Sequence, residues 1–279
     1  MHSLLDVLNK TTAFFEKKGI ENPRLNGELI FAYALKCKRL ELYLQFDRLL
    51  EEEILSKIRP LVKRRAKLEP LQYIIGEMEF CDLKIKVDSR ALIPRPETEC
   101  LIEVVLNQLE TPPARILDLG TGCGVIAMVL AKRFGNAEVL AVDKSSSALS
   151  LAGENIGMLD LEKNIHLVKS DWFEAVSGSY DLIISNPPYL TEREWETAQA
   201  EVREYEPEMA LLASEEGISD LRTILVNAKR YLRPGGIVAL ETGVEHKEML
   251  VEIAGKEAYK HFESFKDWND RHRFFLAWN

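Results

Sequence analysis

No stretch of this sequence is apolar for long enough to cross a membrane, because charged residues interrupt the hydrophobic segments every few positions. The opening stretch, MHSLLDVLNKTTAFFEKK, lacks the basic start and cleavage site of a secretory signal, and it carries acidic residues that transit peptides avoid. These absences argue against a membrane or secreted protein. We therefore expect a globular protein of the cytoplasm with no membrane partner.

The sequence also has few cysteines, no spacing typical of metal ligands, and fewer basic than acidic residues. The four cysteines, Cys37, Cys81, Cys100 and Cys123, form no Cys-x-x-Cys pair, and the five histidines show no metal-ligand spacing. We therefore expect reduced thiols and no metal.

Lys and Arg number 36 against 45 Asp and Glu, which gives a net charge of −9. Because duplex binding depends on basic residues that displace counterions, we expect no direct duplex nucleic-acid partner.

A cluster of basic residues, KRRAK at residues 63–67, ends a stretch with helical periodicity. Cations in the last turn of a helix complement its dipole. The simplest interpretation of this cluster is therefore a solvated helix end rather than a binding patch.

Residues 1–75 are predicted to form a small helical domain. They contain the segments LLDVLNKTTAFF, NPRLNGELIFAYALK and LEEEILSKIRPLVKRRA, and Asn22 stands before Pro23 as a cap stands before the first turn of a helix. Residues 76–95 are predicted to be a hairpin or linker, since FCDLKIKVD alternates apolar and polar residues. Residues 96–279 form the second predicted domain.

The second domain alternates strands and helices. After a helix predicted from about Glu97 to Leu109 come the apolar runs ARILDLG, AEVLAVD, NIHLVKSD, YDLIISN and GGIVALETG, separated by helical segments such as GVIAMVLAKRF. Strands that are apolar nearly throughout and alternate with helices predict an α/β fold, in which a doubly wound parallel sheet is covered on both faces. The final run, RHRFFLAWN, is interpreted as an antiparallel edge strand.

Suggestive residues mark the ends of these strands, where an open parallel sheet binds its ligand. The first strand runs into DLGTGCG, a tight glycine turn, but Val125 takes the place of the third glycine of a dinucleotide fingerprint. The second ends at Asp143, which accepts from ribose hydroxyls or, alternatively, caps the next helix. The third ends at Asp171 and Trp172, an acceptor and an aromatic face for an adenine, unless Trp172 belongs to the core. Together they predict an adenosine site without a pyrophosphate clamp.

The fourth strand ends in YDLIISNPPYL, where Asn186 is followed by two prolines and Tyr189. Two prolines stop a strand and stiffen the turn, and a residue before proline is held extended. A rigid side-chain amide at a strand tip indicates a positioned hydrogen-bonding group. The alternative is that Asn-Pro-Pro only terminates the strand.

Four motifs resemble, in order along the chain, those of class I S-adenosylmethionine-dependent methyltransferases: DLGTGCG, AVD, SDW and NPPY. The closer resemblance is to the PrmC or HemK family, the protein-(glutamine-N5) methyltransferases that modify peptide chain release factors. It rests also on PLQYIIGEMEF, LIPRPETE and EYEPEMALLASEEGISDLR, and it covers almost the whole chain. It departs at residues 270–273, which are DRHR where the family commonly has Gly-Arg-Asp-Arg, so no role is assigned there. It departs also at Cys123, where the family often has serine.

The resemblance implies a seven-stranded, mostly parallel methyltransferase sheet joined to the helical domain by a β-hairpin. It implies S-adenosyl-L-methionine as the cofactor and S-adenosyl-L-homocysteine as the product. The expected cofactor-binding residues are Gly120, Thr121, Gly122, Cys123, Gly124, Asp143, Asp171, Trp172 and Asn186. The expected catalytic residues are Asn186, Pro187 and Tyr189. The expected substrate-binding residues are Asn186, Pro187, Pro188, Tyr189, Arg95 and Glu97.

The side-chain carbonyl of Asn186 and the backbone carbonyl of Pro187 can accept both N–H groups of a planar amide, while Tyr189 stacks on it. With the resemblance, this predicts methylation of the glutamine in the Gly-Gly-Gln motif of release factors. The helical domain then grips that protein, or only covers the mouth of the sheet, and the chain acts as a monomer. The alternative is methylation of an exocyclic amine of a nucleobase in rRNA or DNA, which presents a similar planar NH₂.

Overall fold

The computed structural model describes residues 2–279, and contacts between residues divide this part of the chain into two units. The first unit takes in the chain up to Glu77 together with Gln199–Tyr205. The second unit comprises Met78–Ala198 and Glu206–Asn279. The chain therefore leaves the second unit once, adds a short segment to the first, and returns.

The first unit is mainly helical. Its elements are β1 (His2–Ser3), α1 (Leu4–Lys17), α2 (Pro23–Leu35), the 3-10 helix η1 (Arg39–Gln45), β2 (Leu49–Leu50), α3 (Glu52–Arg65), α4 (Leu71–Ile75) and α9 (Ala200–Tyr205). Leu8 and Phe15 of α1 pack with Phe31 of α2 in its core, and none of the three is exposed. Asn22 occupies the N-cap position of α2 and Pro23 begins the helix, as predicted, but Asn22 adopts a left-handed φ of 48° and its side chain makes no capping hydrogen bond.

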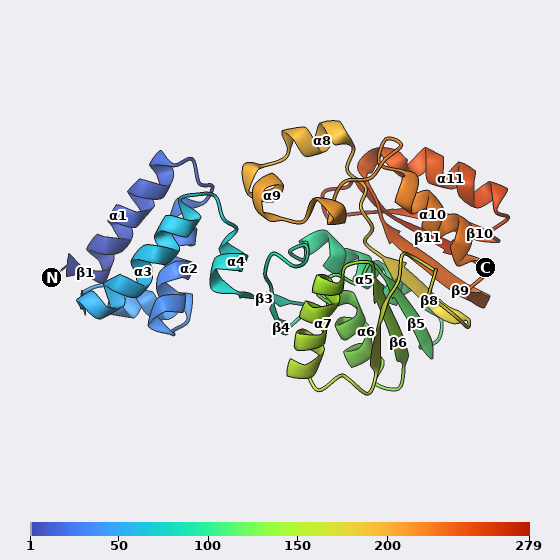
Figure 1. Ribbon diagram of the computed structural model, residues 1–279, viewed down its shortest axis with the longest axis horizontal. Coiled ribbons are helices and arrows are strands. Elements are labelled where there is room, and N and C mark those ends of the chain that lie inside the picture. The colour runs from blue at the N-terminus through green and yellow to red at the C-terminus, as the bar shows by residue number, and fades with distance from the viewer. Residues whose placement is uncertain (1) are drawn as a thin grey trace. The chain divides into compact units, whose positions relative to one another are not determined.

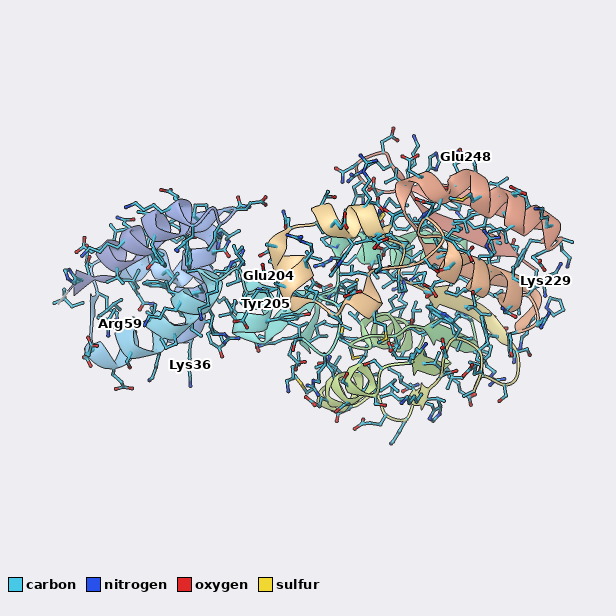
Figure 2. All side chains as sticks on the ribbon, turned by 45° about the horizontal axis from the view of Figure 1, so that its top comes forward. Lys36, Arg59, Glu204, Tyr205, Lys229 and Glu248 are labelled. Atoms are coloured by element: carbon cyan, nitrogen blue, oxygen red, sulfur yellow. The ribbon has the colours of Figure 1, made fainter. Side chains whose placement is uncertain are left out.

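Helix α9 is held in the first unit by specific polar contacts. Arg65 is only 6% exposed, and its guanidinium donates to Glu201 Oε2 on α9 at 2.6 Å. The hydroxyl of Tyr205, labelled in Figure 2, donates to the backbone oxygen of Lys67 at 2.8 Å. The interpretation of KRRAK as a solvated helix end is therefore wrong for Arg65, which is buried because it anchors a segment from the distant half of the sequence.

The second unit begins with the predicted hairpin, β3 (Glu77–Phe80) and β4 (Leu83–Lys86), which form a two-stranded sheet. The two residues between them, Cys81 and Asp82, have φ angles of 45° and 60°. Positive φ at both positions is the geometry of a tight two-residue hairpin turn.

A seven-stranded sheet forms the centre of the second unit (Figure 1). Its strands are β5 (Arg115–Leu119), β6 (Glu138–Asp143), β7 (Ile165–Lys169), β8 (Tyr180–Ser185), β9 (Leu232–Glu241), β10 (His261–Lys266) and β11 (His272–Trp278). The spatial order is β10-β11-β9-β8-β5-β6-β7, and the five strands from β9 to β7 run parallel. This confirms the predicted α/β fold and its mostly parallel sheet.

One strand prediction needs correction. The run RHRFFLAWN forms β11, which is antiparallel as predicted but lies between β9 and β10. The edge strand is β10, whose sequence HFESFK was not recognised as a strand. Its residues alternate between exposed and partly exposed, as expected at a sheet edge, so it lacks the apolar run that identifies the interior strands.

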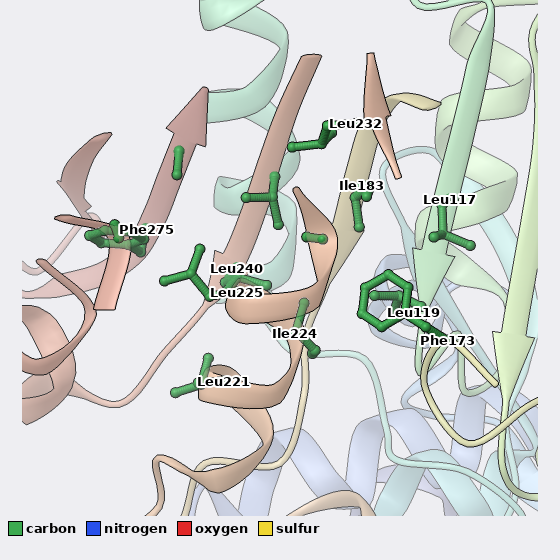
Figure 3. Close-up of a cluster of buried hydrophobic side chains, with 14 of the residues drawn as sticks. Leu117, Leu119, Phe173, Ile183, Leu221, Ile224, Leu225, Leu232, Leu240 and Phe275 are labelled. Carbon is green, nitrogen blue, oxygen red and sulfur yellow. The ribbon is translucent and has the colours of Figure 1, made fainter. Parts of the chain in front are cut away.

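The helices and short 3-10 turns of the second unit are α5 (Pro96–Gln108), α6 (Val125–Arg133), α7 (Ser146–Met158), α8 (Glu192–Thr197), η2 (Glu208–Ala210), α10 (Ser219–Ala228), η3 (Val244–His246) and α11 (Lys247–Lys256). Figure 3 shows Leu117, Ile183 and Leu240 of three strands facing Ile224 and Leu225 of α10. All five side chains are fully buried. Each such burial is worth roughly 1.5 to 3 kcal/mol, so this layer fixes the strand ends on which the site is built.

Within residues 2–279, no helix has the length and apolar character that a membrane crossing requires. The same residues contain no cluster of three or more metal-ligating side chains. The four cysteines are all unpaired.

Candidate active site

The carboxyl ends of the parallel strands border a cavity of about 490 Å³. Small-molecule sites are usually clefts of roughly 300 to 1,000 Å³. The sequence-predicted residues that line this cavity are Gly120, Thr121, Gly122, Cys123, Asp143, Asp171, Trp172, Asn186 and Pro188. The other predicted residues, Gly124, Pro187, Tyr189, Arg95 and Glu97, are not among its lining residues. The structure thus brings the four predicted strand ends together around one space.

The glycine turn after β5 wraps one wall of the cavity. Gly120 has a φ of 69°, and a Cβ at this position would lie 3.5 Å from the Trp172 ring. Gly124 has a φ of 87°, and a Cβ there would lie 3.1 Å from Ala152 Cβ of α7. Gly120 therefore shapes the cavity wall, whereas Gly124 permits close packing of α6 against α7.

Asp118 lies beneath this turn and was not identified from the sequence. Its Oδ2 accepts from Thr121 Oγ1 at 2.6 Å and from the backbone N–H of Ala127 at 3.2 Å. Its Oδ1 is buried without a hydrogen-bond partner among residues 2–279. Burial raises the pKa of Asp118 to about 7, because an unsolvated carboxylate is unfavourable. The side chain thus ties the glycine turn to the start of α6.

Asp143, at the end of β6, organises the opposite side of the turn. Its two carboxylate oxygens accept from the backbone N–H groups of Gly122 at 2.9 Å and Ser145 at 2.8 Å. The N-cap of α7 is Ser145, whose hydroxyl accepts from Ala148 N–H, so the alternative role of Asp143 as the cap is wrong. Burial raises the pKa of Asp143. A carboxylate oxygen accepts more than one hydrogen bond, so both oxygens can still receive donors from a ligand.

The segment after β7 adds an aromatic ring and two more acids. The Trp172 indole N–H donates to Asp220 Oδ1 at 3.1 Å, and Asp220 also lines the cavity. Asp171 forms an ion pair with Lys144 at 2.6 Å. Trp172 has a φ of 45°, an unusual value for a bulky residue, and its partly buried ring lies against Gly120 and packs on the edge of the core. The constrained backbone and the bond to Asp220 together fix the ring at the cavity wall.

These residues fit S-adenosylmethionine. The cavity presents acidic acceptors, Asp143, Asp171 and Asp220, together with an aromatic face at Trp172. A ligand with cationic groups, a ribose diol and an adenine matches acceptors of this kind. Asp143 would hold the ribose and Trp172 would contact the base.

The side-chain amide of Asn186 has a defined orientation at the end of β8. Its Nδ2 donates to Thr98 Oγ1 at 3.0 Å, and Thr98 Oγ1 donates to Glu241 Oε2 at 2.7 Å. Within residues 2–279, neither Asn186 Oδ1 nor the Pro187 carbonyl makes a hydrogen bond. Two carbonyl acceptors on consecutive residues are therefore without a partner in this part of the chain, and of the two residues Asn186 lines the cavity.

Tyr189 is held through both its hydroxyl and its ring. The hydroxyl donates to Glu241 Oε1 at 3.0 Å and accepts from an Arg273 Nη at 2.6 Å. The Arg273 guanidinium lies over one face of the ring, 4.9 Å from the centroid. Burial, followed by the charge of Glu241, raises the pKa of Tyr189. One face of the ring is thus covered by a cation, and an amide can stack only on the other.

Arg95 and Glu97 occupy positions that differ from the prediction. Arg95 forms an ion pair with the buried Glu206 at 2.5 Å, and Glu206 also accepts from the backbone N–H of Ile93 at 3.1 Å. Glu97 is a partly exposed acid in the first turn of α5. The residues of LIPRPETE that line the cavity are Leu92, Pro94 and Thr98.

Sequence reasoning missed Thr98, Glu241, Arg273 and Asp220. Glu241 carried an available signal, because it is an acid at the end of the fifth apolar strand, GGIVALETG, just as Asp143 ends the second. Arg273 belongs to the DRHR stretch, to which no role had been assigned. Thr98 and Asp220 carried no local signal, since both meet their partners only through tertiary packing.

The sheet, the glycine turn and the acidic, aromatic cavity define an S-adenosylmethionine-dependent methyltransferase. Family models match the chain twice: the PrmC N-terminal domain over residues 6–76 and the methyltransferase small domain over residues 97–204. The release factor glutamine methyltransferase of Chlorobaculum tepidum is 37% identical over 278 residues, covering 96% of this chain and 94% of that protein. The chain belongs to the release factor glutamine methyltransferase family.

Further similarities agree with this assignment. The release factor glutamine methyltransferase of Rhodopirellula baltica is 38% identical over 246 residues, which cover 86% of this chain and 83% of that protein. Among solved structures, a methyltransferase from Pyrococcus furiosus superimposes with a TM-score of 0.54 at 23% identity, covering 71% of this chain and 90% of that one. The latter similarity concerns the fold alone.

Proposed function

We propose that this chain methylates the side-chain amide nitrogen of the glutamine in the Gly-Gly-Gln motif of peptide chain release factors. The observation that carries the proposal is the pair of unused acceptors, Asn186 Oδ1 and the Pro187 carbonyl, at the end of β8. A primary amide has two N–H groups in one plane, so two adjacent acceptors orient its nitrogen. Membership of the family supports glutamine as the side chain that carries this amide.

An amide nitrogen is a weak nucleophile because its lone pair is delocalised. When bound, S-adenosylmethionine supplies an electrophilic methyl group on a sulfonium. Asn186 and Pro187 fix the direction of the substrate nitrogen, which lowers the entropic part of the barrier. Their oxygens also stabilise the positive charge that develops on nitrogen as it gains a bond. Tyr189 would stack on the amide plane through the ring face that Arg273 does not cover, and Pro188 lines the cavity.

We further propose that the chain acts as a cytoplasmic monomer and does not bind duplex nucleic acid directly. The net charge of −9 supports the last point. The direct test of the proposed function is mass spectrometry of a release factor after incubation with the protein and S-adenosylmethionine, beside parallel reactions on DNA and rRNA. A methyl group on the Gly-Gly-Gln glutamine is expected. Methylation of a nucleobase without methylation of the factor would replace this proposal with the alternative.

The cofactor site yields a testable expectation at Asp143. Replacing Asp143 with Ala should weaken S-adenosylmethionine binding by roughly 1.5 to 3 kcal/mol, the usual value of a charge-assisted hydrogen bond. The variant also loses the contacts to Gly122 and Ser145, which preshape the turn. Calorimetry measures the affinity, and a thermal melt checks folding. An unchanged affinity in the folded variant would remove Asp143 from the cofactor site.

We propose that the helical unit contributes recognition of the release factor. On η1 it exposes two large apolar side chains, Leu40 at 71% and Leu44 at 88%, and apolar side chains that gather on an exposed surface often mark a site of protein binding. Replacing both with Ser should raise KM for an intact release factor by roughly tenfold or more, since buried contact residues often contribute about 1 kcal/mol or more each. Because neither side chain is packed in the core, the unit should remain folded.

A short Gly-Gly-Gln peptide separates recognition from chemistry in this test. The double variant should methylate the peptide at the unchanged rate, because the peptide lacks the rest of the factor. Met158→Ser, which alters an exposed apolar residue of the second unit, is the matched control and should leave both substrates unaffected. An unchanged KM for the intact factor in the double variant would exclude this part of η1 from recognition.

A further inference from the structure

A buried polar network lies directly behind the Asn186 amide. Glu241 is 0% exposed and Thr98 is 3% exposed. Thr98 Oγ1 joins the two, since it contacts Asn186 Nδ2 at 3.0 Å and Glu241 Oε2 at 2.7 Å. The other carboxylate oxygen, Glu241 Oε1, accepts from the Tyr189 hydroxyl at 3.0 Å and lies 3.8 Å from an Arg273 nitrogen.

The chemistry of a hydroxyl makes this arrangement directional. A hydroxyl has a single proton, and Thr98 uses that proton to donate a hydrogen bond to the Glu241 carboxylate. Its oxygen is then left only with lone pairs and can only accept from Asn186. A carboxamide has one donor end and one acceptor end, so its NH₂ must point to Thr98 and its carbonyl must point away. An isolated Asn would have no comparable reason to prefer this orientation over the flipped one.

We propose that Thr98 and Glu241 are positioning residues that lock the Asn186 carboxamide with its carbonyl facing the substrate. This inference rests on the proposed function for its catalytic consequence but not for the orientation itself. In the flipped orientation, Asn186 would present an NH₂ group to the substrate NH₂, and two donors repel. Glu241 acts at the same time on Tyr189 and, with Arg273, fixes its ring, so one buried carboxylate holds both polar side chains of the Asn-Pro-Pro-Tyr turn.

Burial raises the pKa of Glu241, and the hydrogen bonds from Thr98 and Tyr189 together with the charge of Arg273 oppose this rise and favour the charged carboxylate that the lock requires. Three donors converge on its carboxylate: the hydroxyls of Thr98 and Tyr189 directly, and the Arg273 guanidinium through Tyr189 and by its charge. A buried carboxylate is stable only when its oxygens are satisfied in this way. Arg273, the second arginine of the DRHR stretch, therefore has a role, which is to neutralise the charge behind the site.

The experiment compares Thr98→Val, which keeps the shape but removes the hydroxyl, with Thr98→Ser, which restores it. Single-turnover methylation at saturating cofactor should fall about tenfold in the Val variant, the value of one hydrogen bond of about 1.4 kcal/mol, while the dissociation constant for cofactor changes little. The Ser variant should recover most of the rate. Thr11→Val, a buried threonine of the first unit, is the matched control and should react like the unchanged protein.

A double-variant cycle tests whether Thr98 acts through Asn186. In the Asn186→Ala background there is no carboxamide to orient, so adding Thr98→Val should cause no further loss. An additional tenfold loss there would show that Thr98 acts by another route and would overturn the proposal.

A second readout does not depend on activity. The Asn186 carboxamide protons, followed by NMR with labelled asparagine and assigned through Asn186→Ala, should exchange with solvent at least about tenfold faster in Thr98→Val than in the unchanged protein or in Thr98→Ser. Equal exchange in all three proteins would overturn the lock even if methylation is intact. Faster exchange together with an unchanged protein that fails to methylate release factor would support the lock and reject the proposed function.

Discussion

Replacing Asn186 with Ala should slow methyl transfer by at least about a hundredfold while the protein stays folded. The variant loses one of the two acceptors that orient the substrate nitrogen and stabilise its developing charge. By comparison with oxyanion-hole groups, one such hydrogen bond is worth roughly 2.7 to 4 kcal/mol. Both prolines remain, so the turn should keep its shape. The measurement is single-turnover methylation of release factor at saturating cofactor, with a thermal melt as the folding control.

The Asp variant at this position is the more informative comparison. From the motif alone, Asn186→Asp should keep more activity than Ala, because it retains an acceptor of similar shape. The network argues for the opposite result. The introduced carboxylate would direct an oxygen at Thr98 Oγ1, whose proton already takes part in the hydrogen bond to Glu241. It would also place a second negative charge next to the buried Glu241 carboxylate. We therefore expect the Asp variant to be no better than Ala near neutral pH.

These two variants separate the possible roles of Asn186. If the Ala variant methylates at the unchanged rate, Asn186 only terminates the strand and the proposed mechanism is wrong. If Ala is slow and Asp is fast, the acceptor matters but the lock through Thr98 does not.

The cofactor-free protein should lose stability relative to its Asp118→Asn variant as the pH rises from about 4 to 7. The pKa of Asp118 is raised by burial to about 7, whereas an unfolded aspartate titrates near 4. Between these values the folded state keeps a proton that the unfolded state has lost. The free energy of unfolding therefore falls by about 1.4 kcal/mol per pH unit from this group, or roughly 4 kcal/mol over the window, and the dependence ends above pH 7.

This prediction depends on how the difference in the free energy of unfolding between the two proteins changes with pH, and not on the size of that difference at any one pH. The carboxamide introduced by Asp118→Asn can place an NH₂ where Asp118 Oδ1 lacks a partner, which shifts stability by a constant amount at every pH. Urea titrations followed by tryptophan fluorescence suit the measurement, since all four tryptophans lie in the second unit. Titrations of groups that do not interact with Asp118 cancel in the difference between the two proteins, and Asp143 is the neighbouring acid whose charge Asp118 senses. Asp47→Asn, which alters an exposed acid of the first unit, controls for the loss of one carboxylate. A difference that is independent of pH would show that Asp118 is ionised in the folded protein.

The sequence predicted the fold well where the signal is local. The strands β5, β6, β7, β8 and β9 were identified because strands buried on both faces are apolar runs that end in turns or polar residues. Helix α9 was not assigned to the first unit, because a salt bridge between Arg65 and Glu201 joins positions that are 136 residues apart. The pattern around each of these two residues is that of an ordinary exposed charge.

The residues of the site were likewise predictable where they lie at the ends of strands, and not where they lie behind them. Asp143, Trp172 and Asn186 were predicted to lie together because each ends or follows a strand, and they line one cavity because topology alone brings strand ends together. The support behind Asn186 was not found. Thr98 precedes the sheet by many residues, and the role of Thr98, Glu241 and Arg273 depends on side-chain directions that no spacing rule contains.

The path of α9 bears on how such a protein can change during evolution. A recognition module attached by a single linker can be exchanged in one recombination event. Here the two units share three covalent connections, near Glu77, Ala198 and Tyr205. A recombinant that replaced only the first 77 residues would leave Glu201 without the matching side chain that Arg65 provides. The sequences of the helical unit and of the segment after the Asn-Pro-Pro-Tyr turn are therefore expected to change together during evolution, although they are encoded in two separate parts of the gene.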